Sequence, residues 1–195
     1  MRILLDNGHG ATTKGKRSPD GRLLEYKWTR EIASMVERIL TLKGYDCQRI
    51  VATDEDVPLA KRVAIVNSHV AKLGASNVCL VSIHVDASGA GQQWMKAHGW
   101  SVFVAQNASD KSKRLATCIF QQAKGRGWCV RQQYPNLGYW VKSLAMCRDT
   151  KCPAVLCENF FMDNQSDCDF ISKHENKQAI AQAIADGIQN YCNGI

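Results

Sequence analysis

Three short apolar runs constrain the fold of this chain more than any other feature. They span residues 3–5, 78–83 and 153–157, and each has the length and composition of a buried strand. Apolar residues with helical spacing fill the segments between these runs, as in residues 28–40. Strands that alternate with helices predict an α/β sandwich with a largely parallel sheet. The 195 residues are enough for one domain with a sizeable core, so we expect a single domain over residues 1–195.

Capping signals mark several expected helix ends. Pro58 and Gly74 enclose a helix whose apolar side chains would form one buried face at Leu59, Val63, Val66, Val70 and Leu73. Ser109 would cap a helix that runs to about Lys124. The segment from Ser172 to Glu175 has the spacing of a capping box and would open the last helix, which buries Ile180, Ile184 and Ile188.

Each of the three apolar runs is followed by a residue with ligand or catalytic chemistry, namely His9, His84 and Glu158. The carboxyl ends of parallel strands meet at one edge of a sheet, so these side chains would converge. Glu25 opens the first long helix soon after the loop that leaves His9, and packing of that helix on the sheet would bring its first turn to the same edge. Glycines on both sides of His9 would let the chain turn sharply and leave the imidazole accessible.

Two imidazoles, one carboxylate and an open position form a catalytic zinc site. Zinc would lower the pKa of water from about 15.7 to about 7. A second carboxylate outside the metal would then accept a proton and pass it to a leaving amine. Glu158 suits this second role, because its apolar neighbours would raise its pKa toward neutrality.

Simpler interpretations exist for the same residues. His9 alone fits a plain strand-to-loop turn, Glu25 fits an acid that stabilises a helix start, and Glu158 fits a structural ion pair. Three further histidines are left out of the site because they fall within a helix, on a capping turn or at the amino end of a strand: His69, His174 and His98.

The composition restricts the possible partners. The net charge of +7 favours an anionic partner such as nucleic acid, a membrane surface or an anionic cell-wall polymer, although a basic surface also serves solubility. No segment reaches the roughly 18 consecutive apolar residues that a membrane span needs, and no secretion signal is evident. We therefore expect no membrane insertion, and either synthesis in the cytoplasm without a leader or a trimmed domain.

Nine cysteines are many for a chain of this size. An odd number cannot form a closed set of disulfides, and most of them fall in apolar runs where a thiol behaves as a small apolar side chain. We expect reduced thiols, with a bridge or a minor metal site at Cys147 and Cys152 as the alternative.

Five motifs together resemble the zinc-dependent N-acetylmuramoyl-L-alanine amidases of the amidase-3 family, the peptidoglycan amidases of autolysins, spore-cortex enzymes and phage endolysins. The motifs are Asp6–Gly10, the helix that begins at Glu25, Leu59–Arg62 with Asn67, Ser82–Ala87 and Pro153–Glu158. No single motif is specific, but their order and spacing hold over nearly the whole chain.

The resemblance implies a role for each candidate residue. His9, Glu25 and His84 would bind one Zn²⁺ per chain, and Glu158 would be the general base. The substrate would be peptidoglycan, cut at the amide between N-acetylmuramic acid and L-Ala. The family fold is a three-layer sandwich with a twisted, mostly parallel sheet and helices on both faces. The expected state is a monomer that binds no nucleic acid.

The chain departs from the family pattern near the expected site. Asp86 stands where the family has an amide side chain, Asp54 where it has an arginine, and Phe160–Phe161 where it has Gly-Phe. None of these changes removes an expected ligand, but the carboxylate of Asp86 adds negative charge, which leaves the substrate preference open.

Aromatic and basic residues suggest a substrate groove. The aromatic set is Trp94, Trp100, Trp128, Tyr134, Tyr139 and Trp140, of which some must belong to the core. Nearby cations that could meet the carboxylates of a substrate are Lys96, Arg126 and Arg131. We select Trp94 and Arg131 as candidate substrate-binding residues.

Several alternatives remain open from the sequence. The chain could be a catalytically inactive peptidoglycan-binding domain of the same fold, a zinc peptidase that cuts within the stem peptide, or a nucleic-acid-binding module that uses the aromatic residues. The missing leader favours an endolysin that stays in the cytoplasm until it is released to the cell wall, with a trimmed domain of a secreted autolysin as the alternative.

Overall fold

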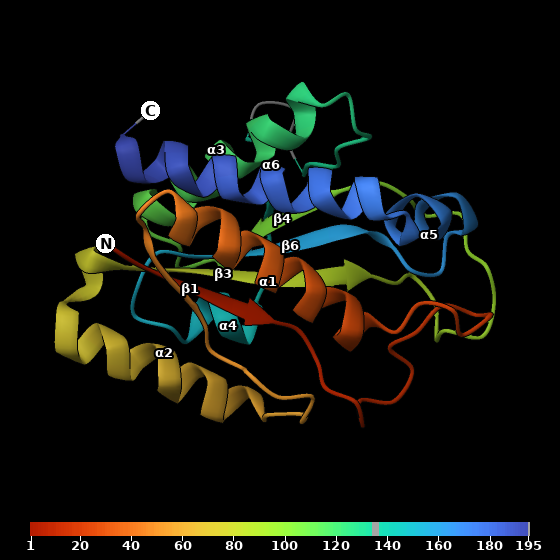
Figure 1. Cartoon of the computed structure of the whole chain (residues 1–195), viewed down its shortest axis with the longest axis horizontal. Helices are drawn as coiled ribbons and strands as arrows, with labels where there is room; N and C mark the ends of the chain where they lie inside the picture. The colour runs from red at the N-terminus through yellow and green to blue at the C-terminus, as the bar shows by residue number, and fades with distance from the viewer. Residues whose placement is uncertain (134–136, 195) are drawn as a thin grey trace.

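A six-stranded sheet forms the centre of the molecule (Figure 1). The structure is a computed structural model that describes residues 1–133 and 137–194. The strand order is β2-β1-β3-β6-β4-β5. The strands are β1 (Arg2–Asn7), β2 (Asp46–Arg49), β3 (Val78–Asp86), β4 (Ser101–Val104), β5 (Trp140–Val141) and β6 (Ala154–Phe161). Strands β2, β1, β3 and β6 are parallel, whereas β4 pairs with β6 in antiparallel orientation. The prediction of a mostly parallel sheet is confirmed.

Helices cover both faces of the sheet, as Figure 1 shows. One face packs against α1 (Glu25–Leu42), α3 (Asp110–Gly125) and α6 (His174–Asn193) in a large apolar core. The other face packs against α2 (Leu59–Leu73) and the single turn α4 (Ala145–Arg148) in a smaller core. Along the chain, the short helix η1 (Ala75–Asn77) follows α2, and helix α5 (Gln165–Ser172) precedes α6. The three-layer arrangement follows from this distribution.

Alternation along the inner strands explains why the runs are apolar throughout. Ile3 and Leu5 of β1 lie in the core beneath α1 and α6, while Leu4 lies in the core beneath α2. Successive side chains of a strand point to opposite faces, so a strand covered on both faces has no solvent-facing positions.

Among the described residues, no helix has both the length and the apolar character required to cross a lipid bilayer.

Pro58 and Gly74 flank α2 as predicted, whereas one of the two predicted serine N-caps is confirmed and the other is wrong. Ser109 is the N-cap of α3, and its Oγ accepts a hydrogen bond from the backbone N–H of Ser112 at 3.2 Å. Ser172 does not cap α6, because it is the last residue of α5 and its hydroxyl donates to the carbonyl of Cys168 at 2.6 Å. The sequence pattern missed α5, whose own N-cap is Asn164.

Helix α2 buries less of its apolar face than its spacing predicted. Val66 and Val70 are buried, but Leu59 is 56% exposed and Leu73 is 38% exposed. The third buried residue of this helix is the charged Arg62. Strand β6 also continues beyond Glu158 to Phe161, so Glu158 lies within the strand rather than at its end.

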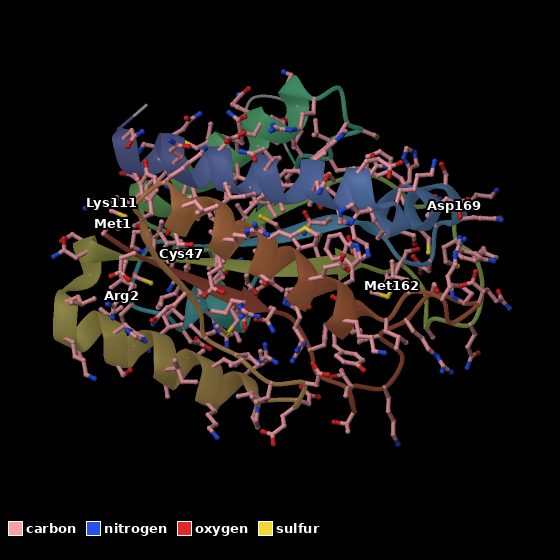
Figure 2. The ribbon with its side chains drawn as sticks, viewed as in Figure 1. Met1, Arg2, Cys47, Lys111, Met162 and Asp169 are labelled. Carbon is pink, nitrogen blue, oxygen red and sulfur yellow. The ribbon has the colours of Figure 1, made fainter. Side chains whose placement is uncertain are left out.

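No disulfide joins any of the nine cysteines, which leaves the alternative Cys147–Cys152 bridge unsupported. Seven of them are buried, among them Cys47 in the core beneath α1 (Figure 2). Burial raises the pKa of Cys47 and of Cys152 to about 12, so their reactive thiolate forms are scarce at neutral pH. Cys129 is exposed and Cys192 is half-buried.

This pattern predicts how the thiols react in the folded protein. With a thiol-reactive disulfide reagent at about pH 8, Cys129 should be modified first and Cys192 more slowly, and the rest should wait for unfolding. The number of thiols released in each kinetic phase is the measurement. Cys129→Ser should remove the fast phase, and several rapidly reacting thiols in that variant would contradict the described packing.

Candidate metal centre

The turn after β1 places two histidines against each other. The backbone N–H of Gly8 donates to the carbonyl of Ile83 at 3.0 Å, which continues the pairing of β1 with β3. A Cβ atom at Gly8 would lie 2.2 Å from Cε1 of His84, so only glycine allows the His84 ring to lie against this backbone. Likewise, a Cβ atom at Gly10 would lie 2.2 Å from Cα of Asp56. The two glycines thus accommodate a side chain on one side and a loop on the other.

His9 itself adopts a left-handed backbone conformation, with φ of 61°. This region is unfavourable for a residue with a Cβ atom, so neighbouring contacts must stabilise it. Its carbonyl oxygen accepts one hydrogen bond from Nη2 of Arg62 at 2.8 Å and another from Nη2 of Arg30 at 3.2 Å. The imidazole ring lies 5.0 Å from the His84 ring, centroid to centroid, with the two planes at 88°.

Glu25 joins the two histidines from the first turn of α1, which lies near the carboxyl ends of β1 and β3 (Figure 1). Its side chain is fully buried. Oε1 accepts a hydrogen bond from the backbone N–H of Val85 at 3.0 Å and lies 3.2 Å from Nδ1 of His84. Oε2 has no hydrogen-bond partner within the described part of the chain, and it lies 3.5 Å from Nε2 of His9.

One ligand atom from each of His9, Glu25 and His84 lies within 4.8 Å of the other two. A buried carboxylate oxygen without a donor, facing two imidazoles, is an unfavourable arrangement unless a cation completes it. These nitrogen and oxygen donors are ligand types that zinc and other first-row metals accept. The residues therefore fit a metal ion, and the structure brings together the three side chains that the sequence selected.

The three residues influence one another's pKa through charge interactions and a hydrogen bond. Burial lowers the pKa of His9 to about 4, although the charge of Glu25 acts in the opposite direction. Burial also acts against the charged form of His84, but its hydrogen bond to Glu25 and the charge of that carboxylate outweigh this effect and raise the pKa of His84. The same interactions hold the pKa of Glu25 below its usual value despite its burial. At neutral pH, His9 is thus neutral and offers a lone pair.

Glu158 lies beside this group on the neighbouring strand, where it is in register with His84 across the β3–β6 pair. Burial raises the pKa of Glu158 to about 8, against the opposing effect of His84, and the carboxylates of Asp86 and Glu25 add to the rise. Its Oε2 is buried without a hydrogen-bond partner among the described residues. The expected rise of this pKa is therefore present, and two neighbouring carboxylates contribute to it.

A cavity of about 270 Å³ lies next to the two histidines on the side of α2. Besides His9 and His84, its lining includes Asp56, Leu59 and Arg62. The exposed position of Leu59 on α2 is thus at the edge of the site.

The two candidate substrate-binding residues lie in different surroundings. Nη1 of Arg131 pairs with Oδ2 of Asp86 at 3.2 Å, and its guanidinium lies 4.7 Å from the ring centroid of Phe161. Trp94 is 37% exposed and lies beside Arg22, whose guanidinium is 5.8 Å from the centroid of the indole ring.

The other members of the aromatic and basic set are mostly placed elsewhere. Trp100 and Tyr139 are buried in the core, and Nε1 of Trp100 donates to Asn159 at 2.9 Å. Arg126 pairs with Asp186 of α6 at 3.0 Å, so it serves helix packing. Tyr134 lies outside the described residues.

Sequence reasoning assigned no role to the polar residues behind the site. Arg62 and Asp6 are both buried and form an ion pair of 2.8 Å. Two features of the sequence indicate that these residues could be buried. Arg62 has the same helical spacing as Val66 and Val70, and Asp6 directly follows an apolar strand.

The low pKa of His9 predicts how the stability of the metal-free protein depends on pH. The unfolded chain binds a proton at His9 near pH 6.5 and the folded chain near pH 4, so unfolding takes up a proton between these values and stability falls as the pH decreases. The loss is at most on the order of 3 kcal/mol, reduced by solvent around the partly exposed ring.

The comparison of wild type with His9→Gln tests this, with urea midpoints measured at about pH 7 and about pH 4.5 in the presence of a chelator. The wild type should lose more stability than the variant over this range. Equal losses would show that His9 titrates normally in the folded state.

Comparisons with known proteins agree with this architecture. The sequence profile of the N-acetylmuramoyl-L-alanine amidase family, Amidase_3, matches residues 3–190. The probable cell wall amidase LytH of Staphylococcus epidermidis is 26% identical over 194 residues, which are 97% of this chain and 57% of the relative. The endolysin of Bacillus phage SPP1 is 26% identical over 193 residues, which are 98% of this chain and 66% of the relative. The chain thus spans less than two thirds of the length of these relatives.

A solved structure shows the same fold over the whole chain. The N-acetylmuramyl-L-alanine amidase Ami1 from Mycobacterium smegmatis superposes with a TM-score of 0.84 at 21% identity, and the match covers 100% of this chain and 98% of that one. The profile match extends from β1 to α6 and includes every residue of the candidate centre. This chain belongs to the N-acetylmuramoyl-L-alanine amidase family.

Proposed function

We propose that this chain is a zinc hydrolase that cuts the amide between N-acetylmuramic acid and L-Ala in peptidoglycan. The observation that carries the proposal is the buried Oε2 of Glu25, which faces His9 and has no hydrogen-bond donor within the described residues. Membership of the amidase family and the names of the relatives, a cell wall amidase and an endolysin, support the choice of bond and polymer. The net charge of +7 suits an anionic wall polymer.

His9, Glu25 and His84 would hold one Zn²⁺, because they offer two imidazole nitrogens and a carboxylate oxygen around one point. Zinc bound there would supply Lewis acidity, which polarises a carbonyl and brings the pKa of water to about 7. The protein contributes a ligand set that is already assembled. Glu25 is fixed by the N–H of Val85, and His9 is neutral at physiological pH because burial lowers its pKa.

Glu158 would accept a proton from the attacking water and deliver it to the leaving amine. Burial raises its pKa to about 8, which lies close to neutrality and suits a group that must both accept and donate a proton. Its register with His84 places it on the strand next to the ligands, where a scissile bond held near the metal would be within reach.

Arg131 and Trp94 would bind the substrate. The Arg131 side chain is 32% exposed and reaches the end of β3 through its pair with Asp86, whose carboxylate contributes to the raised pKa of Glu158. The guanidinium can therefore meet a carboxylate of the stem peptide close to the base. Trp94 offers an exposed indole on which a sugar ring can stack.

The central test compares wild type with Glu158→Gln and His9→Ala. Wild type and Glu158→Gln should each bind one zinc per chain, and Glu158→Gln should lose roughly 100- to 10,000-fold in rate because it cannot carry the proton. His9→Ala should lose the metal itself, because it removes a ligand. Metal content by elemental analysis and the digestion of purified cell walls are the two measurements.

The products separate this proposal from its rivals. Free stem peptides that begin with L-Ala, detected by mass spectrometry, identify the amidase, whereas cleavage inside the stem identifies a peptidase. A chelator should abolish digestion and zinc should restore it. A protein that binds walls without releasing products would instead be an inactive binding domain.

The substrate-binding role has its own test on a soluble muropeptide. Arg131→Ala should raise KM by roughly tenfold or more, because a charge-assisted hydrogen bond is lost, and Trp94→Ala should raise it in the same direction. Arg126→Ala is the matched control, since Arg126 pairs with Asp186 on α6. An unchanged KM in the first two variants would exclude both residues from the binding site.

A further inference from the structure

A charged side chain is buried directly behind the turn that carries His9. Arg62 of α2 is 2% exposed and ion-pairs with Asp6, which is 1% exposed. Its Nε donates to the carbonyl of Val57 at 2.7 Å, Nη1 donates to Oδ1 of Asp6 at 2.8 Å and to the carbonyl of Asn7 at 2.7 Å, and Nη2 donates to the carbonyl of His9 at 2.8 Å. A buried guanidinium needs partners of this kind. Three of its four acceptors belong to the segment Asp6–His9.

The contacts continue across the sheet to the strand of the second histidine. Oδ2 of Asp6 accepts a hydrogen bond from the hydroxyl of Ser82 at 2.5 Å. Asp6 and Ser82 are opposite each other in the β1–β3 register. Since His9 follows Asp6 by three residues and His84 follows Ser82 by two, the Arg62–Asp6–Ser82 chain of contacts connects α2 to both histidine-bearing segments.

We propose that Arg62 is a positioning residue, which acts through Asp6 and Ser82 to set the distance and orientation between His9 and His84 before a metal binds. The inference rests on the proposed function, in which both histidines are zinc ligands. Arg62 acts on the geometry of the site through its hydrogen bond to the carbonyl of His9, and Asp6 carries the opposite charge in direct contact with the guanidinium. The left-handed conformation of His9, with φ of 61°, is the feature that the hydrogen bond from Nη2 of Arg62 maintains.

Zinc affinity is the readout that separates positioning from a purely structural role. Arg62→Met should weaken zinc binding by about 10- to 100-fold, as expected when a group that orients a ligand is removed. Arg62→Lys keeps the charge but loses the forked geometry, so it should recover only part of the affinity. Competition with a chromogenic chelator measures the dissociation constant, and circular dichroism checks that each variant is folded.

Ser82→Ala provides a second and milder variant. It removes only the hydroxyl that ties Asp6 to β3, and it should weaken zinc binding in the same direction even if Arg62→Met fails to fold. The stability-matched control is Ile188→Ala, in the buried stripe of α6, which lowers the melting temperature without touching any residue of this chain of contacts. Ile188→Ala should bind zinc with wild-type affinity.

The outcomes are distinguishable. A wild-type protein that binds no zinc would overturn the proposed function and this inference with it. Wild-type affinity in Arg62→Met and Ser82→Ala, beside zinc binding by the wild type, would overturn the inference alone. A loss of affinity in Ile188→Ala as large as in Arg62→Met would also overturn it, because affinity would then follow stability.

Discussion

The carboxylate of Glu25 is buried at the point where α1, β3 and the turn after β1 meet, and the rest of the site depends on it. A buried carboxylate is costly unless hydrogen bonds and opposite charges compensate it. The N–H of Val85 and the ring of His84 satisfy one oxygen, and the first turn of a helix is a favourable place for a negative charge. The second oxygen remains without a donor among the described residues. The packing of Trp28, Ile32 and Val36 on the sheet holds α1 in place, so the chain maintains a negative charge next to two imidazoles.

The two faces of the sheet differ in how apolar they are near the site. The face beneath α1, α3 and α6 holds the large apolar core. On the face beneath α2, the apolar rows turn polar toward the carboxyl ends of the strands. In β1 the row runs from Leu4 to Asp6, and in β3 it runs from Leu80 through Ser82 to His84. Arg62 of α2 pairs with Asp6 in this polar part of the face, and the cavity beside His9 and His84 lies on the same side of the sheet.

The features that could be predicted best from the sequence are those set by local pattern and by the geometry of parallel strands, namely the buried strands and the meeting of the two histidines. Strands covered on both faces must be continuous apolar runs, and parallel strands share one carboxyl edge, so His9 and His84 could be placed together without coordinates. What it could not predict depends on contacts between distant residues. The pairing of Asp86 with Arg131 joins positions 45 residues apart. The burial of Arg62 depends on Asp6, 56 residues away. Ser172 fits a capping box locally, but α5 already includes it.

The departure at Asp86 can be understood from its partner. A carboxylate two residues after a candidate ligand would compete for the cation or repel an anionic substrate if it were alone. Here Arg131 lies between Asp86 and the ring of Phe161, and the N–H of Ala87 donates to Oδ1 of Asp86 at 2.9 Å. Both oxygens therefore have donors, although the carboxylate still contributes to the raised pKa of Glu158. The carboxylate of Asp86 thus orients the guanidinium of Arg131 at the edge of the site. Because each side chain holds the other in place, a change of substrate preference should replace Asp86 and Arg131 together.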